Sequence, residues 1–166
     1  MKILLINIPF VFESKNDISL SHCLGILQIA SFLKQNNCDV EILDALQLGI
    51  NNVQKKDGYY RVGLTNQQIV DKINYDYDLI GISIPFSHLA FLAHELIDKI
   101  KEFYAKIPIV IGGVYPSTQP KLAIQSKADF IVIGEGEEPM LQMVNYLEKN
   151  IKDLPNCIIH KNANLD

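Results

Sequence analysis

The stretch IPIVIGGVYPS (Ile107–Ser117) decides the fold of this chain. Its β-branched run stops on two adjacent glycines, Gly112 and Gly113, and similar runs occur in DLIGISIPFS (Asp78–Ser87) and FIVIGEGEEP (Phe130–Pro139). Strands that read as continuous apolar runs are covered on both faces, which is typical of a parallel sheet between layers of helices. Each run therefore predicts a buried parallel strand that ends in a turn of small or polar residues.

Strand and helix patterns alternate through the rest of the chain. The expected strands are Lys2–Pro9, Asp39–Asp44, Asp78–Ile84, Pro108–Ile111 and Asp129–Ile133. The expected helices are Cys23–Asn37, Asn66–Ile73, His88–Tyr104, Pro120–Ser126 and Glu137–Lys149. This alternation predicts an α/β fold with a doubly wound, five-stranded parallel sheet in the order 2-1-3-4-5 and helices on both faces.

The remaining segments are expected at the surface or at the ends of elements. Glu13–Ser19 is polar and predicts a loop, and the turn-rich stretch Gly49–Gly63 predicts a long surface excursion. Thr65 and Ser87 are suited to capping the helices that follow them, because their hydroxyls can accept from free backbone N–H groups. Cys157–His160 could add a short strand at the edge of the sheet.

Composition excludes several classes of function. The formal charge is −4 and no basic run occurs, so nucleic-acid binding has no electrostatic support. The apolar start ILLINIPFVF is too short to span a bilayer, and no membrane association is expected. The three cysteines lie far apart with no metal-like spacing, which favours reduced thiols and a cytoplasmic protein.

Small and polar residues gather where the predicted strands end, and ligands of parallel sheets bind at that edge. The candidates are Ser83 and Ser87, then Gly112, Gly113, Val114 and Tyr115, and then Gly134, Glu135 and Gly136. Each set also has a purely structural interpretation as a turn or a helix cap. Two adjacent glycines are more than a turn usually needs, which favours a ligand lying against the backbone.

The order of these segments resembles the cobalamin-binding domain at the N-terminus of cobalamin-dependent radical S-adenosylmethionine enzymes. The resemblance covers about residues 1–160 and is carried by KILLINIPF, CLGILQIASFLKQNNCDVEILD, DLIGISIPFS, IPIVIGGVYPS and ADFIVIGEGEEPMLQMVNYLE. It implies a flavodoxin-like sheet with the corrin over the carboxyl ends of the strands. The nucleotide tail of cobalamin would insert beside the third and fourth strands.

The resemblance also implies roles for single residues. Ser83 and Ser87 match polar positions near the tail, and Gly112-Gly113 match the glycine pair against which the tail packs. Gly134, Glu135 and Gly136 match the loop after the fifth strand. Val114 and Tyr115 follow the glycine pair, and Tyr115 stands where the family commonly has histidine. The loop after the first strand would face the lower side of the corrin.

The expected cobalt site contains no protein ligand, and no other metal site is expected. Many cobalamin proteins ligate cobalt through the histidine of a DxHxxG motif. Here LSHCLG (Leu20–Gly25) keeps His22 and the glycine but has Leu20 in place of the acid. A histidine ligand needs a partner on its second ring nitrogen, so we expect His22 not to ligate cobalt.

The resemblance places the chemistry outside this stretch of sequence. Radical S-adenosylmethionine enzymes hold an iron–sulfur cluster and S-adenosylmethionine through CxxxCxxC, a motif that this chain lacks. We expect residues 1–150 to form the cobalamin-binding domain and residues 151–166 to form a tail or linker toward a radical S-adenosylmethionine domain. That partner domain would supply methyl transfer or related chemistry, and this chain alone would be inert.

Two other classes of function remain open at this point. One is a flavodoxin-like regulatory or scaffold module that has lost cobalamin. A phosphoryl-accepting receiver is disfavoured, because Asn7-Ile8-Pro9 and Ser83 stand where its acidic residues belong. The other is a flavin- or nucleotide-binding protein that uses the same crevice. Whether the chain is an excised domain or a standalone module is also open.

Overall fold

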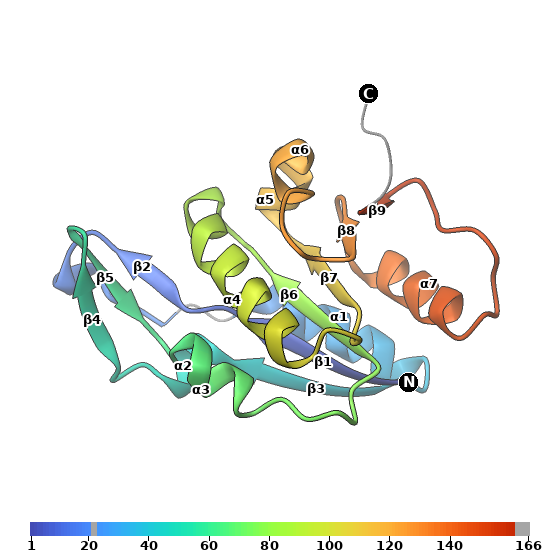
Figure 1. Cartoon of the computed structure of the whole chain (residues 1–166), viewed down its shortest axis with the longest axis horizontal. Coiled ribbons are helices and arrows are strands. Elements are labelled where there is room, and N and C mark those ends of the chain that lie inside the picture. The colour runs from blue at the N-terminus through green and yellow to red at the C-terminus, as the bar shows by residue number, and fades with distance from the viewer. Residues whose placement is uncertain (21–22, 162–166) are drawn as a thin grey trace.

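The computed structural model describes residues 1–20 and 23–161 and has a mainly parallel central sheet (Figure 1). The strand order is β3-β1-β6-β7-β8-β9. These strands span Asp39–Asp44 (β3), Lys2–Asn7 (β1), Leu79–Ser83 (β6), Ile109–Gly112 (β7), Phe130–Val132 (β8) and Ile158–His160 (β9). The first five run parallel, and β9 pairs antiparallel with β8. The predicted α/β class with a mainly parallel sheet is confirmed.

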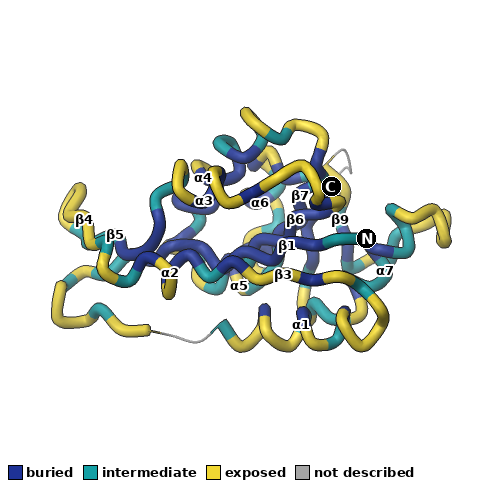
Figure 2. Tube along the Cα trace, turned by 90° about the horizontal axis from the view of Figure 1, so that it is seen from below, coloured by how far each residue is buried: buried dark blue, intermediate teal, exposed yellow. Residues whose placement is uncertain are grey.

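The helices lie on both faces of this sheet, as Figure 2 shows for α1 on one side and α3 and α4 on the other. Helices α1 (Leu24–Gln35) and α7 (Glu137–Leu147) contact each other, and so do α3 (Asn66–Val70) and α4 (Ala90–Phe103). The shorter helices are α2 (Ala45–Leu48), α5 (Val114–Thr118) and α6 (Pro120–Ala123), with 3-10 turns η1 (Lys15–Asp17) and η2 (Ser87–Leu89). Among the described residues, no helix is long and apolar enough to cross a membrane.

The period of two along each strand divides the core into two clusters, one on each face of the sheet. In β1, Ile3 and Leu5 pack with α1 and α7, whereas Leu4 and Ile6 pack with α3 and α4. The buried row of α1 is Ile26, Ala30 and Leu33, which follows helical spacing. Both faces are covered, and this explains why the strands read as continuous apolar runs.

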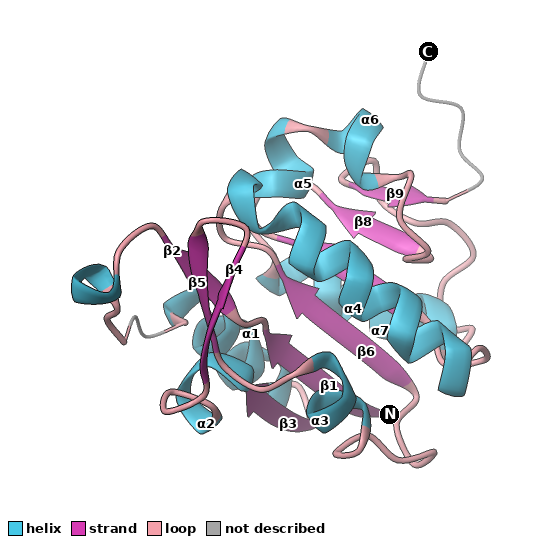
Figure 3. Cartoon of the chain, turned by 60° about the vertical axis from the view of Figure 1, so that its left-hand side comes forward, coloured by secondary structure: helices cyan, strands magenta, loops and turns pink. Residues whose placement is uncertain are grey.

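A second, three-stranded antiparallel sheet was not predicted. It has the order β2-β5-β4 and consists of Phe10–Phe12 (β2), Val53–Lys56 (β4) and Tyr59–Val62 (β5). Figure 3 shows it beyond the carboxyl ends of β1 and β6. Asp57 and Gly58 have φ of 50° and 87°, the pair of positive values that a tight hairpin turn requires. The predicted excursion Gly49–Gly63 therefore contains a hairpin.

The predicted helix cap at Thr65 is present, whereas the one at Ser87 is not. Thr65 caps α3 in a complete capping box, in which its hydroxyl accepts from the Gln68 N–H and the Gln68 side chain accepts from the Thr65 N–H. The predicted cap at Ser87 is wrong. Ser87 instead begins η2 after Phe86, and α4 begins at Ala90 without a side-chain cap. The chain thus enters α4 through a tight 3-10 turn.

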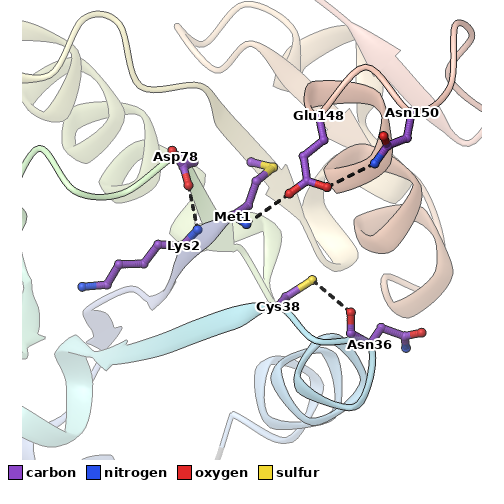
Figure 4. A network of polar contacts seen from close by, with 7 residues as sticks. All are labelled: Met1, Lys2, Asn36, Cys38, Asp78, Glu148 and Asn150. Atoms are coloured by element: carbon purple, nitrogen blue, oxygen red, sulfur yellow. Dashed lines mark hydrogen bonds and ion pairs between the residues drawn. The ribbon is translucent and has the colours of Figure 1, made fainter.

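The amino ends of the strands are tied together away from the glycine turns (Figure 4). The Met1 ammonium lies 3.1 Å from Glu148 Oε1, just beyond α7. The Lys2 N–H donates to Asp78 Oδ2 over 2.7 Å, which links β1 to the start of β6. These contacts hold β1, β6 and α7 together at the end of the sheet opposite to the one that carries the candidate residues.

Candidate functional site

The strand register brings the predicted small residues into rows across the sheet. Asn7 of β1 pairs with Ser83 of β6, and Ser83 pairs with Gly112 of β7. The row before it consists of Leu5, Gly81 and Val110. Leu5 and Val110 belong to the cluster under α1 and α7, so the period of two places Gly81, Ser83 and Gly112 on that same face. The sheet therefore lacks large side chains there.

A cavity of about 390 Å³ lies over these rows, between the sheet and the helices α1 and α7. Its sheet side includes Leu5, Gly81, Ser83, Val110, Gly112 and Val132, and its helix side includes Gly25, Ile26, Ile29, Gly136, Glu137 and Met140. Ile82, Gly113, Val114, Gln28, Ser117, Thr118, Gly134 and Glu135 complete the lining. Glycines on both sides, Gly112 on the sheet and Gly25 on α1, leave the space that the cavity occupies.

The two glycines at the end of β7 have different roles. Gly113 has φ of 108°, and a Cβ there would lie 2.7 Å from the Ile84 carbonyl oxygen, so the fold itself requires glycine. A Cβ on Gly112 would meet only the Val132 Cβ, at 3.8 Å. Backbone packing therefore tolerates a side chain at position 112. Because Gly112 lines the cavity, its missing side chain keeps that space open.

The loop after β8 lines the exposed side of the cavity, which is its mouth. Gly134 has φ of 83°, and its N–H donates to Ser117 Oγ over 3.0 Å, which fixes this loop against α5. A Cβ on Gly136 would lie 2.6 Å from Ile29 Cδ1, so glycine there lets α7 begin close to α1. Glu135 and Glu137 line the mouth. Their carboxylates suit ligand hydroxyl or amide donors better than a phosphate.

Seven of the nine predicted site residues lie together around this cavity. They are Ser83, Gly112, Gly113, Val114, Gly134, Glu135 and Gly136. Ser87 and Tyr115 do not line it. Tyr115 is buried in the cluster under α4, on the other face of the sheet, with its hydroxyl 3.2 Å from His94 Nε2. Ser87 lies in η2, at the start of the segment that leads into α4.

Two glycines that line the cavity, one on α1 and one on β6, were not among the predicted site residues. Gly25 lies inside α1, and no atom would lie within 4 Å of a Cβ there. Gly81 lies inside β6, where a Cβ would be 2.6 Å from Leu5 Cδ2. Glycine weakens both helix and strand interiors, so its presence inside either element was a usable signal of close approach or open space.

A smaller cavity of about 240 Å³ adjoins the first and shares Gly25, Ile26, Ser83, Gly113 and Val114 with it. Its other lining residues are Asn7, Phe10, Cys23, Leu24, Pro85 and Phe86. The segment after β1, which includes Phe10, thus faces the same opening as the strand ends.

A polar cluster stands beside this second cavity. Asn7 Nδ2 donates to Asp44 Oδ1 over 3.0 Å, and the Cys23 thiol lies 3.4 Å from Asp44 Oδ2. Burial and the Asp44 carboxylate raise the pKa of Cys23 to about 11. The thiol therefore stays protonated at neutral pH and can donate to Asp44.

No group of three or more His, Cys, Asp or Glu side chains in the described part of the chain could hold a metal ion. The candidate His22 lies outside the described residues. The cavity combines buried apolar residues with a few exposed polar residues, a composition typical of small-molecule sites.

Comparison with known families assigns most of these elements to one domain family. The family model described as the B12 binding domain matches residues 19–144, which is more than half of the chain. The matched range includes α1, the ends of β6, β7 and β8, and most of α7. No curated protein matches the chain.

Proposed function

The chain belongs to the B12-binding domain family, and we propose that it is the cobalamin-binding module of a radical S-adenosylmethionine enzyme. The observation that supports the proposal most directly is the cavity beside Ser83 and Gly112, at the carboxyl edge of the parallel sheet. Ligands of open α/β sheets bind in this position. A flat heteroaromatic group suits a slot between a helix and a sheet surface on which glycine and serine stand among apolar side chains.

The fit between the residues and cobalamin rests on space and on polarity. Gly112 leaves the slot open beside Val132, and Gly25 leaves it open on the side of α1. Ser83, Ser117 and Glu135 provide hydroxyl and carboxylate groups near the mouth for the ribose and amide groups of the cofactor. We propose that Ser83, Gly112, Gly113, Val114, Gly134, Glu135 and Gly136 hold the nucleotide tail, with the corrin over the adjoining cavity near Asn7 and Phe10.

The role of this chain would be to bind and orient the cofactor. Bound cobalamin supplies a carrier for a methyl group, and the protein supplies position and exclusion of water. S-adenosylmethionine and an iron–sulfur cluster would belong to a separate domain, which we propose as the partner. Residues 1–150 would form the binding unit, and residues 151–166 would lead toward that partner. A CxxxCxxC motif downstream in the coding sequence would support this arrangement.

A titration with hydroxocobalamin tests the proposed site. The parent protein should bind it, and Gly112→Leu should bind at least about tenfold more weakly, because the new side chain occupies the slot. Gly112→Ala should fall between them. Circular dichroism of each variant would show that the fold is retained. Equal affinity of the parent and Gly112→Leu would contradict the proposed geometry.

The same titration separates the rival functions. Absence of binding by the folded parent would favour the scaffold that has lost its cofactor. Tight binding of a flavin mononucleotide in place of hydroxocobalamin would favour the flavin-binding alternative. The absorption spectra of the two cofactors distinguish these results directly.

A further inference from the structure

The inner end of the cavity differs sharply from its mouth. Seven lining residues are buried, and all of them are apolar: Leu5, Ile26, Gly81, Ile82, Val110, Val132 and Met140. Ile82 belongs to the core cluster on the other face of the sheet, so it lines the cavity through its backbone. The polar lining residues Gln28, Ser83, Ser117, Thr118, Glu135 and Glu137 are all partly or fully exposed. The part of a ligand that enters most deeply therefore meets hydrocarbon and the thioether of Met140.

The backbone at the inner end, like the side chains there, offers a ligand few hydrogen-bonding groups. Gly81 and Val110 pair with each other and with their other neighbours in the parallel ladder, so their N–H and C=O groups lie in the plane of the sheet. The Met140 methyl reaches over Gly81, where its Cε would lie 3.6 Å from an added Cβ. A ring placed there would contact Met140, and sulfur–aromatic contacts of this kind are favourable.

We propose that this inner end selects among cobamides by the polarity of the nucleotide base, and favours benzimidazoles over purines. This inference rests on the proposed function. The outer edge of dimethylbenzimidazole carries only C–H and methyl groups, which an apolar pocket accepts. The corresponding edge of adenine carries ring nitrogens and an amino group. These would lose their hydrogen bonds to water without replacement.

The size of the expected discrimination follows from that loss. A single unpaired polar group in a buried site weakens binding by about tenfold or more. We therefore expect hydroxocobalamin to bind at least about tenfold more tightly than the hydroxo form of pseudocobalamin, in which adenine replaces dimethylbenzimidazole. Cobinamide, which has no base, should bind more weakly than hydroxocobalamin, because it leaves the apolar slot unfilled.

Two valine variants isolate the role of the inner end. Val132→Thr keeps the side-chain shape and adds a hydroxyl beside Gly112, where the Val132 Cβ faces the slot. It should reduce the preference for hydroxocobalamin over pseudocobalamin. Val144→Thr is the matched control, since Val144 is equally buried on α7 and does not line the cavity. It should leave the affinity ratio unchanged. Met140→Gln offers a second test over Gly81, and should also reduce the ratio.

Equilibrium dialysis of the two cobamides and of cobinamide against the parent and each variant gives the required affinities. A preference of about tenfold or more that decreases in Val132→Thr and persists in Val144→Thr supports the inference. Equal binding of hydroxocobalamin and pseudocobalamin, both tighter than cobinamide, overturns the selection and leaves the proposed function standing. Cobinamide binding as tightly as hydroxocobalamin overturns the use of the slot. Failure of every cobamide to bind overturns the proposed function as well.

Discussion

At the scale of single residues, the two adjacent glycines at the end of β7 differ in role. The fold requires glycine at position 113, whereas glycine at position 112 keeps the cavity open. Gly113 adopts φ of 108°, and its neighbour Tyr115 donates its N–H to the Ile84 carbonyl over 3.2 Å. A side chain at position 113 would press on that same carbonyl oxygen. Gly112 has no comparable constraint, and its missing side chain opens the cavity.

This difference predicts a large loss of stability for one alanine substitution and a small change for its neighbour. Gly113→Ala should destabilise the protein by roughly 2 kcal/mol or more, because it combines a disfavoured backbone conformation with a steric clash. Gly112→Ala should change the free energy of unfolding by less than about 0.5 kcal/mol. Urea unfolding of both variants measures this. A loss at position 112 as large as that at position 113 would show that the fold requires both glycines.

Of the seven predicted residues around the cavity, Ser83 and Gly112 lie within strands, and the other five follow strand ends. Ser83 and Gly112 pair directly, because both end parallel strands of the same sheet. Tyr115 and Ser87 also follow strand ends, and neither lines the cavity. Beyond a strand end the period of two no longer applies, and Tyr115 turns toward His94 on the opposite face.

At the scale of elements, the long apolar strands and helices were predictable because burial imposes a period on their sequences. The β4–β5 hairpin was not recognised, since all four residues of β4 are exposed and show no such period. Its signal was local instead: Asp57-Gly58 is a strong indicator of a tight hairpin turn when it stands between two strand-like segments.

The capping box of α3 should contribute measurably to the stability of the protein. Thr65→Ala should lower the free energy of unfolding by about 1 kcal/mol, because the Gln68 N–H loses its acceptor at the start of a short helix. Thr65→Ser keeps the hydroxyl and should stay close to the parent. Thermal unfolding of the three proteins compares them. An alanine variant as stable as the parent would mean that burial of Ile69 and Val70 alone holds α3.

At the scale of the whole molecule, the two faces of the sheet are packed differently. The face under α3 and α4 is filled with large side chains, whereas the face under α1 and α7 contains the cavity. Tyr115 and His94 belong to the filled side, and burial lowers the pKa of His94 below its ordinary value of 6.5. The folded protein therefore resists protonation at this residue more than the unfolded chain does.

The sign of this shift sets the pH dependence of stability. Above its unfolded pKa His94 is neutral in both states, so it adds no dependence on pH. As the pH falls below that value, the unfolded chain takes up a proton that the folded protein resists, and stability decreases. His94→Gln should therefore lose less thermal stability than the parent between about pH 7.5 and about pH 5.5. Equal losses in the two proteins would show that His94 does not contribute to the pH dependence of stability.

We propose that the nucleotide tail of cobalamin lies in the cavity beside Gly112, away from cobalt. The electron paramagnetic resonance spectrum of cob(II)alamin bound to the protein tests this most directly, because a nitrogen ligand splits the cobalt signal. We expect a spectrum without nitrogen coupling in the parent and in His22→Ala. Nitrogen coupling that persists in His22→Ala would show that the base or another nitrogen donor is on cobalt, and would contradict the proposed arrangement. Coupling that disappears in His22→Ala would instead identify His22 as the ligand.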